Sequence, residues 1–439
     1  MDGSISTTAQ GEKFSPTVRY VVIRSKTVPI SVHWSFLLFV WSLPFESLDV
    51  GFAPNSLSVS RLIGLLFFGC YLLFYNPFLG KRPFPRPCPA VCWFLGYLAI
   101  YLMSALFIDP QFAEMAWIRV VTVLQLVVLL WITTDLLKNQ KMRKSFLFAY
   151  PMSAVYLALG VIFGLPGMET RTGLTGRMTA IGQDENLLAG IMALAVVILI
   201  GLSMQTVFKY LLSKILLSVM ILPLLLAIVK TGSRTGTLTV LIGSLMYLLP
   251  YRRSKRAVIV VILATCGVGF LVYLIATNTL AMKRWQEARE GDLSTRERVL
   301  PTALGMISER PIFGWHPVEF AYEIGARIGR RGDVDAHNLF LSILGEMGLI
   351  GIIPFINGLL LCFRAAWTAL RGDLGLMPLA LLSAVLALNM GVPALLWKPF
   401  WLAMGLTLAA AFTTNYKTAR YKHVSLVHAL LKKDVLRAT

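Results

Sequence analysis

Long apolar stretches recur along the whole chain and are separated by short polar segments. A helix that crosses a bilayer needs about 20 mostly apolar residues. Twelve stretches approach that length: 28–45, 61–79, 91–108, 115–134, 146–164, 186–205, 211–229, 235–250, 257–277, 337–362, 375–393 and 397–415. The pattern predicts an all-α, polytopic membrane protein, in which residues 1–439 form a single integral membrane domain of about twelve transmembrane helices.

Composition and charge narrow the class of protein. Of the 439 residues, 56% are hydrophobic and 14% are charged, whereas soluble proteins carry about 45–50% and about 25%. This excludes a disordered chain and an ordinary soluble enzyme.

The placement of the net charge of +19 predicts topology, because 25 of the 41 basic residues but only five of the 22 acidic ones fall in one set of alternating segments. That set comprises residues 1–27, 80–90, 135–145, 206–214, 251–256, 363–374 and 416–439. The positive-inside rule places this set, and hence both termini, in the cytoplasm. The basic charge is therefore a topology signal and does not indicate nucleic acid as a partner.

Two polar segments on the opposite side are unusually long. We expect 165–185 to be a periplasmic loop, 278–336 to be a large periplasmic loop, and 416–439 to be a basic cytoplasmic tail. The outer segments keep many basic residues against the positive-inside bias. They are Arg171, Arg177, Lys230, Arg234, Lys283, Arg284, Arg289, Arg296, Arg298, Arg310, Arg327, Arg330 and Arg331. Guanidinium groups bind phosphate well, so this set indicates an anionic ligand. The alternative is that acids of the same loops pair with these residues.

Arg234 lies in a short motif between two predicted spans, Thr231-Gly232-Ser233-Arg234-Thr235-Gly236, directly after Lys230. The glycines permit a tight turn, and the following helix N-terminus offers free N–H groups to an anion. The alternative is an arginine that only anchors the helix end at the membrane interface.

His337 begins the tenth predicted span, next to Asp335 and Asn338. A neutral imidazole can remove a proton from a hydroxyl group near neutral pH, and Asp333 and Asp335 could orient it or raise its basicity. The alternative is a histidine that merely caps the helix. No metal-binding spacing occurs, and the five cysteines lie singly; we therefore expect no metal and no cofactor.

Several segments resemble a known family. The motif around Arg234 resembles the "SRxG" signature of the O-antigen ligase and O-antigen polymerase superfamily. The stretch from Ser294 to Trp315 and the motifs His337-Asn338-Leu339-Phe340-Leu341 and Gly345-Glu346-Met347-Gly348-Leu349-Ile350-Gly351 also resemble that family. The resemblance covers roughly 228–355, with weaker agreement from Arg177 to Asn186. Departures include Thr295, where the family pattern has glycine, Leu300 in place of tryptophan, and Arg310 in place of histidine.

The resemblance implies a GT-C-like glycosyltransferase of the bacterial inner membrane with a periplasmic active site. The donor would be a glycan on undecaprenyl pyrophosphate, and the acceptor would be lipid A-core for a ligase or another glycan for a polymerase. His337 would be the catalytic base and Arg234, Arg177 and Arg296 or Arg298 would bind pyrophosphate. Asp335, Asn338, Lys230 and Arg171 would support them. Inversion at the anomeric carbon without a metal is expected. A non-enzymatic polyprenol-glycan transporter is the alternative from another class.

Overall fold

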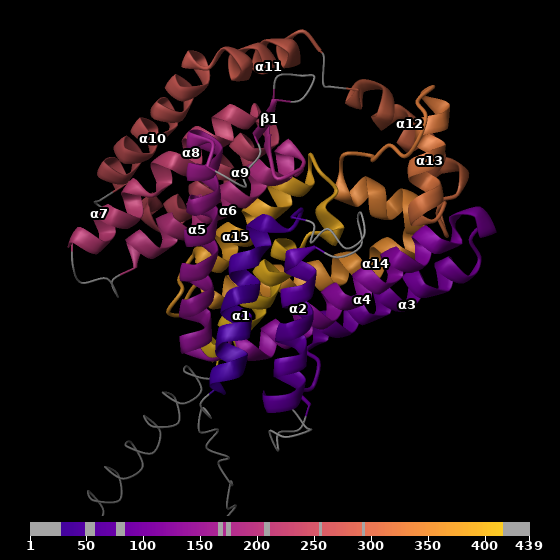
Figure 1. Ribbon diagram of the computed structural model, residues 1–439, viewed down its shortest axis with the longest axis horizontal. Coiled ribbons are helices and arrows are strands. Elements are labelled where there is room, and N and C mark those ends of the chain that lie inside the picture. Colours follow the sequence, from indigo (N-terminus) through magenta and orange to yellow (C-terminus); the bar gives the residue numbers. More distant parts are fainter. Residues whose placement is uncertain are drawn as a thin grey trace, which may run out of the picture.

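The computed structural model describes residues 28–48, 58–75, 84–165, 170–172, 177–205, 211–253, 257–291 and 295–415. Apart from one short antiparallel hairpin, its elements are helices, most of which pack into one bundle (Figure 1).

The described residues of the first half of the chain form six α-helices and the hairpin. They are α1 (Ile30–Ser42) with η1 (Leu43–Phe45), α2 (Val59–Cys70) with the π-turn η2 (Tyr71–Tyr75), α3 (Pro89–Leu106), η3 (Pro110–Phe112), α4 (Ala113–Leu136), α5 (Gln140–Phe163), β1 (Thr170–Thr172), β2 (Met178–Ala180) and α6 (Glu185–Met204).

The second half continues with helices on both sides of the predicted large loop. They are α7 (Leu211–Val219), α8 (Ile221–Thr231), α9 (Arg234–Leu245), η4 (Met246–Arg253), α10 (Ala257–Thr277), α11 (Thr279–Arg289), α12 (Arg296–Glu309), α13 (Pro317–Arg327), α14 (Leu339–Ala369), α15 (Met377–Asn389) and η5 (Ala394–Leu396). A last helix covers 398–415.

The helices confirm a polytopic membrane protein. Each of the twelve predicted spans coincides with helix, although the seventh is divided into α7 and α8. Within the described residues, six helices are long and apolar enough to cross a bilayer, or seven if α10 and α11 form one span bent by 97°. Four further apolar helices are shorter, namely Ile30–Phe45, Val59–Tyr75, Arg234–Leu249 and Met377–Asn389. The number twelve therefore stays a prediction.

Small residues bring the central helices close together. A Cβ atom built on Gly236 would lie 2.4 Å from the Cβ atom of Ala189, and one on Gly243 would lie 2.5 Å from Val197. Helices in membranes associate through such close backbone approach. The glycine of the "SRxG" motif therefore lets α9 pack against α6, which fixes the N-terminus of α9 beside that of α6.

Side-chain contacts define two ends of the bundle. His33 bonds Ser145 at 2.9 Å near the start of α1 and α5, and the Phe45 and Tyr156 rings lie 6.1 Å apart farther along, so the two helices run in parallel. The amide of Gln183, just before α6, donates to the carbonyl oxygen of Pro44 at 2.6 Å. The end of α1 and the start of α6 thus lie at one end, opposite the start of α5.

The two predicted loops contain regular structure. Segment 165–185 includes the β1–β2 hairpin, and segment 278–336 includes α11, α12 and α13. The latter two helices share a small core of their own, built from Val299, Ala303, Met306, Trp315, Phe320, Ile324 and Ala336. The hairpin, α11 and α12 lie at the top of the view in Figure 1.

The helix α14 is broken where the large loop contacts it. Gly348 has φ of +59° and ψ of −162°, which interrupts the helix. The N–H groups of Trp315 and His316 donate to the carbonyl oxygens of Gly345 and Glu346, both at 2.8 Å. Beyond the break, the N–H groups of residues 349 and 350 donate to the carbonyl oxygens of residues 311 and 312. The loop backbone therefore replaces the hydrogen bonds that the break removes, as a buried backbone requires.

Candidate active site

Arg177, which directly precedes β2, is held by three partners. Its guanidinium donates to the carbonyl oxygen of Thr231 at 3.1 Å and to Oδ1 of Asn186 at 3.0 Å, and it forms an ion pair with Glu185 at 3.3 Å. Burial lowers its pKa, Glu185 opposes that change, and Arg284 adds to it. An arginine stays protonated at neutral pH under such a shift, so Arg177 contributes a fixed positive charge.

Asn186 connects this arginine to the "SRxG" motif. The hydroxyl of Ser233 donates to the same Asn186 oxygen at 2.8 Å, and it accepts the N–H of Gly236 at 3.1 Å as the N-cap of α9. The weaker part of the family resemblance, from Arg177 to Asn186, is thus joined directly to the stronger part. Because Ser233 satisfies one N–H of the helix start, the side chain of Arg234 emerges at a fixed position.

Arg234 lies against α11. One of its guanidinium nitrogens donates to the carbonyl oxygen of Arg284 at 3.2 Å. Arg284 itself is half-buried and pairs with Glu287 at 3.2 Å, one turn farther along α11. The sequence placed Arg284 among the outer cations but did not select it as a site residue. The only signal was its place in the helical run that follows α10.

Arg296 brings the cluster together. It is the first residue of α12, and it donates to the carbonyl oxygen of Gly391, just beyond α15, at 2.7 Å. Burial lowers its pKa most, and the charges of Arg234, Arg177 and Arg284 lower it further. Four guanidinium groups from four separate segments therefore act on one another. Glu185, Glu287 and Asp184 offset part of the repulsion, and an anion bound among the guanidinium groups would offset more of it. We call Arg177, Arg234, Arg284 and Arg296 the arginine cluster.

Arg296 and Arg298 differ in where their side chains lie. Two residues along an α-helix correspond to a rotation of about 200°, so the two side chains leave α12 on different sides. Arg296 is half-buried in the cluster, whereas Arg298 is exposed. Residue 295, which precedes them, has φ of +73° and so occupies the left-handed region that glycine favours. This is the position at which the family pattern has glycine.

Two of the supporting residues are not brought into the arginine cluster by any contact that the structure describes. Lys230 is half-buried in the last turn of α8. Arg171 pairs with Thr179 through the β1–β2 backbone register, and its side chain lies outside the described residues. In the described part of the chain, no three His, Cys, Asp or Glu side chains gather as ligands for a metal ion.

His337 lies two residues before α14, next to the arginine cluster. It has φ of +53° and is half-buried. Burial lowers its pKa most, Arg296 lowers it further, and Asp335 and Asp184 oppose the change. Asp335 raises the pKa of His337, as expected, but burial and Arg296 outweigh it, so the net shift is downward. The imidazole is neutral near pH 7, as a general base must be.

Asn338 performs the capping function that His337 could have had. Its side-chain oxygen accepts the N–H groups of Phe340 and Leu341 at 3.0 and 3.2 Å. Asp335 is exposed, and Asp184, which the sequence did not single out, caps α6 by accepting the N–H of Asn186 at 2.8 Å. The cap of α14 is thus complete without the imidazole, which leaves His337 available for chemistry.

Other outer arginines pair with acids. Arg327 bonds Glu309 at 2.5 Å and Glu323 at 2.8 Å, and Arg310 lies 3.7 Å from Glu319. Both guanidinium groups also lie over the ring of Trp315. For these residues the acid-pairing alternative is correct, and they stabilise α12 and α13 instead of forming an anion site.

His316 is the other histidine on this side. It caps α13, where its Nδ1 accepts the N–H of Val318 at 3.4 Å, and burial together with Arg119 lowers its pKa to about 4. Arg119 in turn donates to the carbonyl oxygen of Pro317 at 2.9 Å. These contacts give His316 and Arg119 a structural role in docking α13 on α4.

Comparison with known proteins bears on this arrangement. A sequence profile of the family described as "O-Antigen ligase" matches residues 218–356. An O-antigen ligase of Pseudomonas aeruginosa is 28% identical over 193 residues, which is 43% of this chain. The match spans 40% of the length of that relative. These findings confirm the resemblance to the O-antigen ligase superfamily, and the matching segment contains three of the four clustered arginines and His337.

Proposed function

We propose that the protein transfers a glycan from undecaprenyl pyrophosphate to an acceptor hydroxyl, with the pyrophosphate bound by the arginine cluster. The observation that carries this proposal is the gathering of Arg296 with Arg234, Arg177 and Arg284, whose charges depress its pKa. Like charges at close range are costly, and a dianionic diphosphate offsets that cost.

The helix starts around the cluster add to the attraction for an anion. Arg234 and Arg296 are the first residues of α9 and α12, and His337 lies two residues before α14. Helix N-termini carry partial positive charge and free N–H groups. The forked guanidinium groups then neutralise the charge that develops on the departing pyrophosphate.

His337 is the proposed general base. The acceptor hydroxyl attacks the anomeric carbon, its proton passes to the neutral imidazole, and the bond from that carbon to the pyrophosphate oxygen breaks. A pyrophosphate is a good leaving group, so one direct displacement with inversion is sufficient and needs no covalent intermediate. Asp335 and Asp184 stabilise the imidazolium that forms, since their charges raise the pKa of His337.

The proposed location is the bacterial inner membrane, with the arginine cluster on the periplasmic side and both termini in the cytoplasm. The cluster lies at the end of the bundle formed by the hairpin, α11 and α12, while basic segments 135–145 and 363–374 lie at the other end. The positive-inside rule supports this orientation. Labelling of single cysteines at position 210 and at the exposed position 331 with an impermeant reagent in intact cells tests it; labelling at 210 alone would contradict it.

Among transfer reactions, we propose ligation of O-antigen to lipid A-core. The relative from Pseudomonas aeruginosa and the matching family are both described as O-antigen ligase. A polymerase would present the same arginines and histidine to a different acceptor. Complementation of strains that lack either the ligase or the polymerase distinguishes the two: restored attachment of O-antigen to lipid A-core supports ligation, whereas restored chain length alone supports polymerisation.

The chemistry itself is tested with the purified protein, a lipid-linked glycan donor and an acceptor. Arg234→Ala should abolish transfer, and Arg234→Lys should be severely impaired because an ammonium group cannot form a two-point fork. Arg310→Ala is the matched control, since Arg310 is an outer arginine that pairs with an acid outside the cluster. Full activity of the Lys variant would reduce Arg234 to a general charge, and donor movement across vesicles without transfer would favour a transporter.

A further inference from the structure

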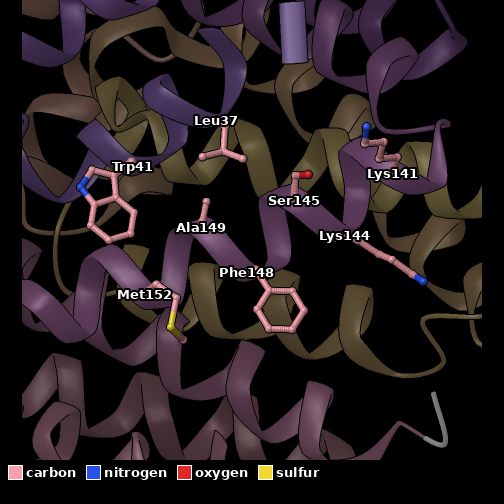
Figure 2. Close-up of a pocket in the computed structure, with 8 residues that line it drawn as sticks. All are labelled: Leu37, Trp41, Lys141, Lys144, Ser145, Phe148, Ala149 and Met152. Atoms are coloured by element: carbon pink, nitrogen blue, oxygen red, sulfur yellow. The ribbon is translucent and has the colours of Figure 1, made fainter. Parts of the chain in front are cut away.

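A groove between α1 and α5 lies at the end of the bundle opposite the arginine cluster. It has a volume of about 410 Å³, within the range of about 300–1,000 Å³ that is typical of ligand sites. Eight residues line it: Leu37, Trp41, Lys141, Lys144, Ser145, Phe148, Ala149 and Met152. Figure 2 shows the two lysines at one end of this row, and Trp41 and Met152 at the other.

The distribution of charge along the groove follows from helix periodicity. The α5 residues that line it recur at intervals of three and four, so they form one stripe on the helix surface. The stripe is basic in the first two turns and apolar in the next two. Trp41 is 38% exposed, so the apolar part is open to the bilayer there. The groove thus has a cationic end at the membrane boundary and an apolar body inside the membrane.

A neighbouring arginine is paired with an acidic side chain, unlike the two lysines of the groove. Arg143 belongs to the same helical turn but points inward, is buried, and bonds Asp373 at 2.6 Å. Lys141 and Lys144 are exposed, and neither forms an ion pair with an acidic side chain in the part of the chain that the structure describes. The charge of the groove is therefore available to a partner from outside the protein.

We propose that this groove binds one anionic glycerophospholipid, with its phosphate between Lys141 and Lys144. One acyl chain lies along Leu37, Phe148 and Met152 toward Trp41. A lipid phosphate and its acyl chain match the order of basic and apolar residues from the boundary inward. Basic pockets between transmembrane helices at the cytoplasmic boundary recognise anionic head groups in this way, and the site is separate from the proposed transfer chemistry.

Binding is measured by native mass spectrometry of the full-length protein in detergent, titrated with phosphatidylglycerol or with phosphatidylethanolamine of the same acyl chains. The wild-type protein should retain phosphatidylglycerol preferentially. The loss should be about fivefold for Lys141→Ala or Lys144→Ala and about thirtyfold for the double variant, as expected for basic residues at an anionic lipid surface. Lys141→Glu with Lys144→Glu should abolish the preference.

The matched control removes the same charge from the same end of the molecule. Arg364 and Arg371 are exposed and lie near the C-terminal end of α14. Arg364→Ala with Arg371→Ala should leave the preference for phosphatidylglycerol unchanged. An equal loss in this control would show a general charge effect and overturn the proposal, as would equal retention of both lipids by the wild-type protein.

A photoreactive amino acid in place of Met152 identifies the occupant of the apolar part. A crosslink to the acyl chain of phosphatidylglycerol, reduced in the Lys141→Ala/Lys144→Ala background, supports the proposal. A crosslink to another segment of the same chain would show that the protein fills its own groove and would refute lipid binding there.

Discussion

Removal of Arg296 should separate catalysis from stability. In the folded protein, its guanidinium makes one hydrogen bond of 2.7 Å, to the carbonyl oxygen of Gly391. A hydrogen bond with one charged partner contributes about 1.5–3 kcal/mol. Arg296→Ala loses that bond but also relieves repulsion from three neighbouring guanidinium groups. The net change in the free energy of unfolding should therefore be smaller than the value of the hydrogen bond.

The effect on transfer should be much larger. If the guanidinium stabilises the charge on the leaving pyrophosphate, its loss resembles loss of one donor from an oxyanion site, which costs about 10²–10³-fold in rate. Arg296→Lys should recover little, because an ammonium group lacks the planar fork. The matched control is Arg298→Ala, which removes an exposed arginine of the same helix and should keep near-wild-type activity.

The assay is single-turnover transfer by purified protein in nanodiscs, with thermal unfolding measured on the same samples. The pH profile supplies a second readout. Since Arg296 lowers the pKa of His337, the residual activity of Arg296→Ala should show its acidic limb at higher pH than the wild-type protein. An activity loss that is as large in Arg298→Ala, or that is accompanied by an equivalent loss of folded protein, would refute this reasoning.

Three other variants test the remaining parts of the site. His337→Asn keeps a side chain that tolerates a positive φ but removes the base, so transfer should fall by about 10²–10⁴-fold while donor binding persists. In the wild-type protein, protonation of His337 inactivates the base. Because the pKa of His337 is lowered, the rate should fall only as the pH drops through a value below 6.5, the ordinary pKa of histidine. Thr295→Gly should raise the free energy of unfolding by up to about 1 kcal/mol, because it removes the strain of a β-branched residue in the left-handed region. The thermal midpoint should rise accordingly, and activity should be retained. Gly236→Ala should destabilise the protein by about 1–3 kcal/mol through overpacking against Ala189, and the double variant with Ala189→Gly should recover most of that loss; no recovery would mean that the contact between α6 and α9 is not the cause.

The apolar pattern was sufficient to predict where the helices lie but not how they are divided. The predicted span 257–277 coincides with α10, whereas the predicted span 211–229 is divided into α7 and α8. The pattern also did not predict the bend of 97° between α10 and α11, which arises because Asn278 leaves the helical conformation and accepts the N–H of Ala281 at 2.9 Å. The helix α12 was detectable, since Val299, Ala303 and Met306 follow a spacing of four and three residues and are buried. The segment was instead interpreted as a loop because of its many positive charges.

Site residues that lie in a sequence motif could be predicted, whereas residues that only the fold brings to the site could not. Arg234 and His337 lie in recognisable motifs, whereas Arg284 and Asp184 carry no such mark. They join the site because α11 bends back over the start of α9 and because α6 begins beside the hairpin. The distinction between Arg296 and Arg298 likewise depends on where α12 begins, and a helix boundary is uncertain by one or two residues from sequence.

The broken helix explains why the histidine motif and the "ExGxxG" motif occur nine residues apart in one segment. His337 precedes the first half of α14, and Gly348 ends that half. The backbone of residues 311–316 bonds both sides of the break, so the orientation of the first half depends on the large loop as well as on the membrane span. A Cβ atom on Gly348 would lie 2.2 Å from the carbonyl oxygen of Ile312, hence no larger residue fits without displacing the loop. Since Arg296 begins α12, which belongs to the same loop, the imidazole and the guanidinium are held by one connected piece of backbone. The histidine and glycine motifs therefore belong to one structural unit, the first half of α14. His337 lies at its start beside Arg296, and close packing at Gly348 fixes the position of its other end.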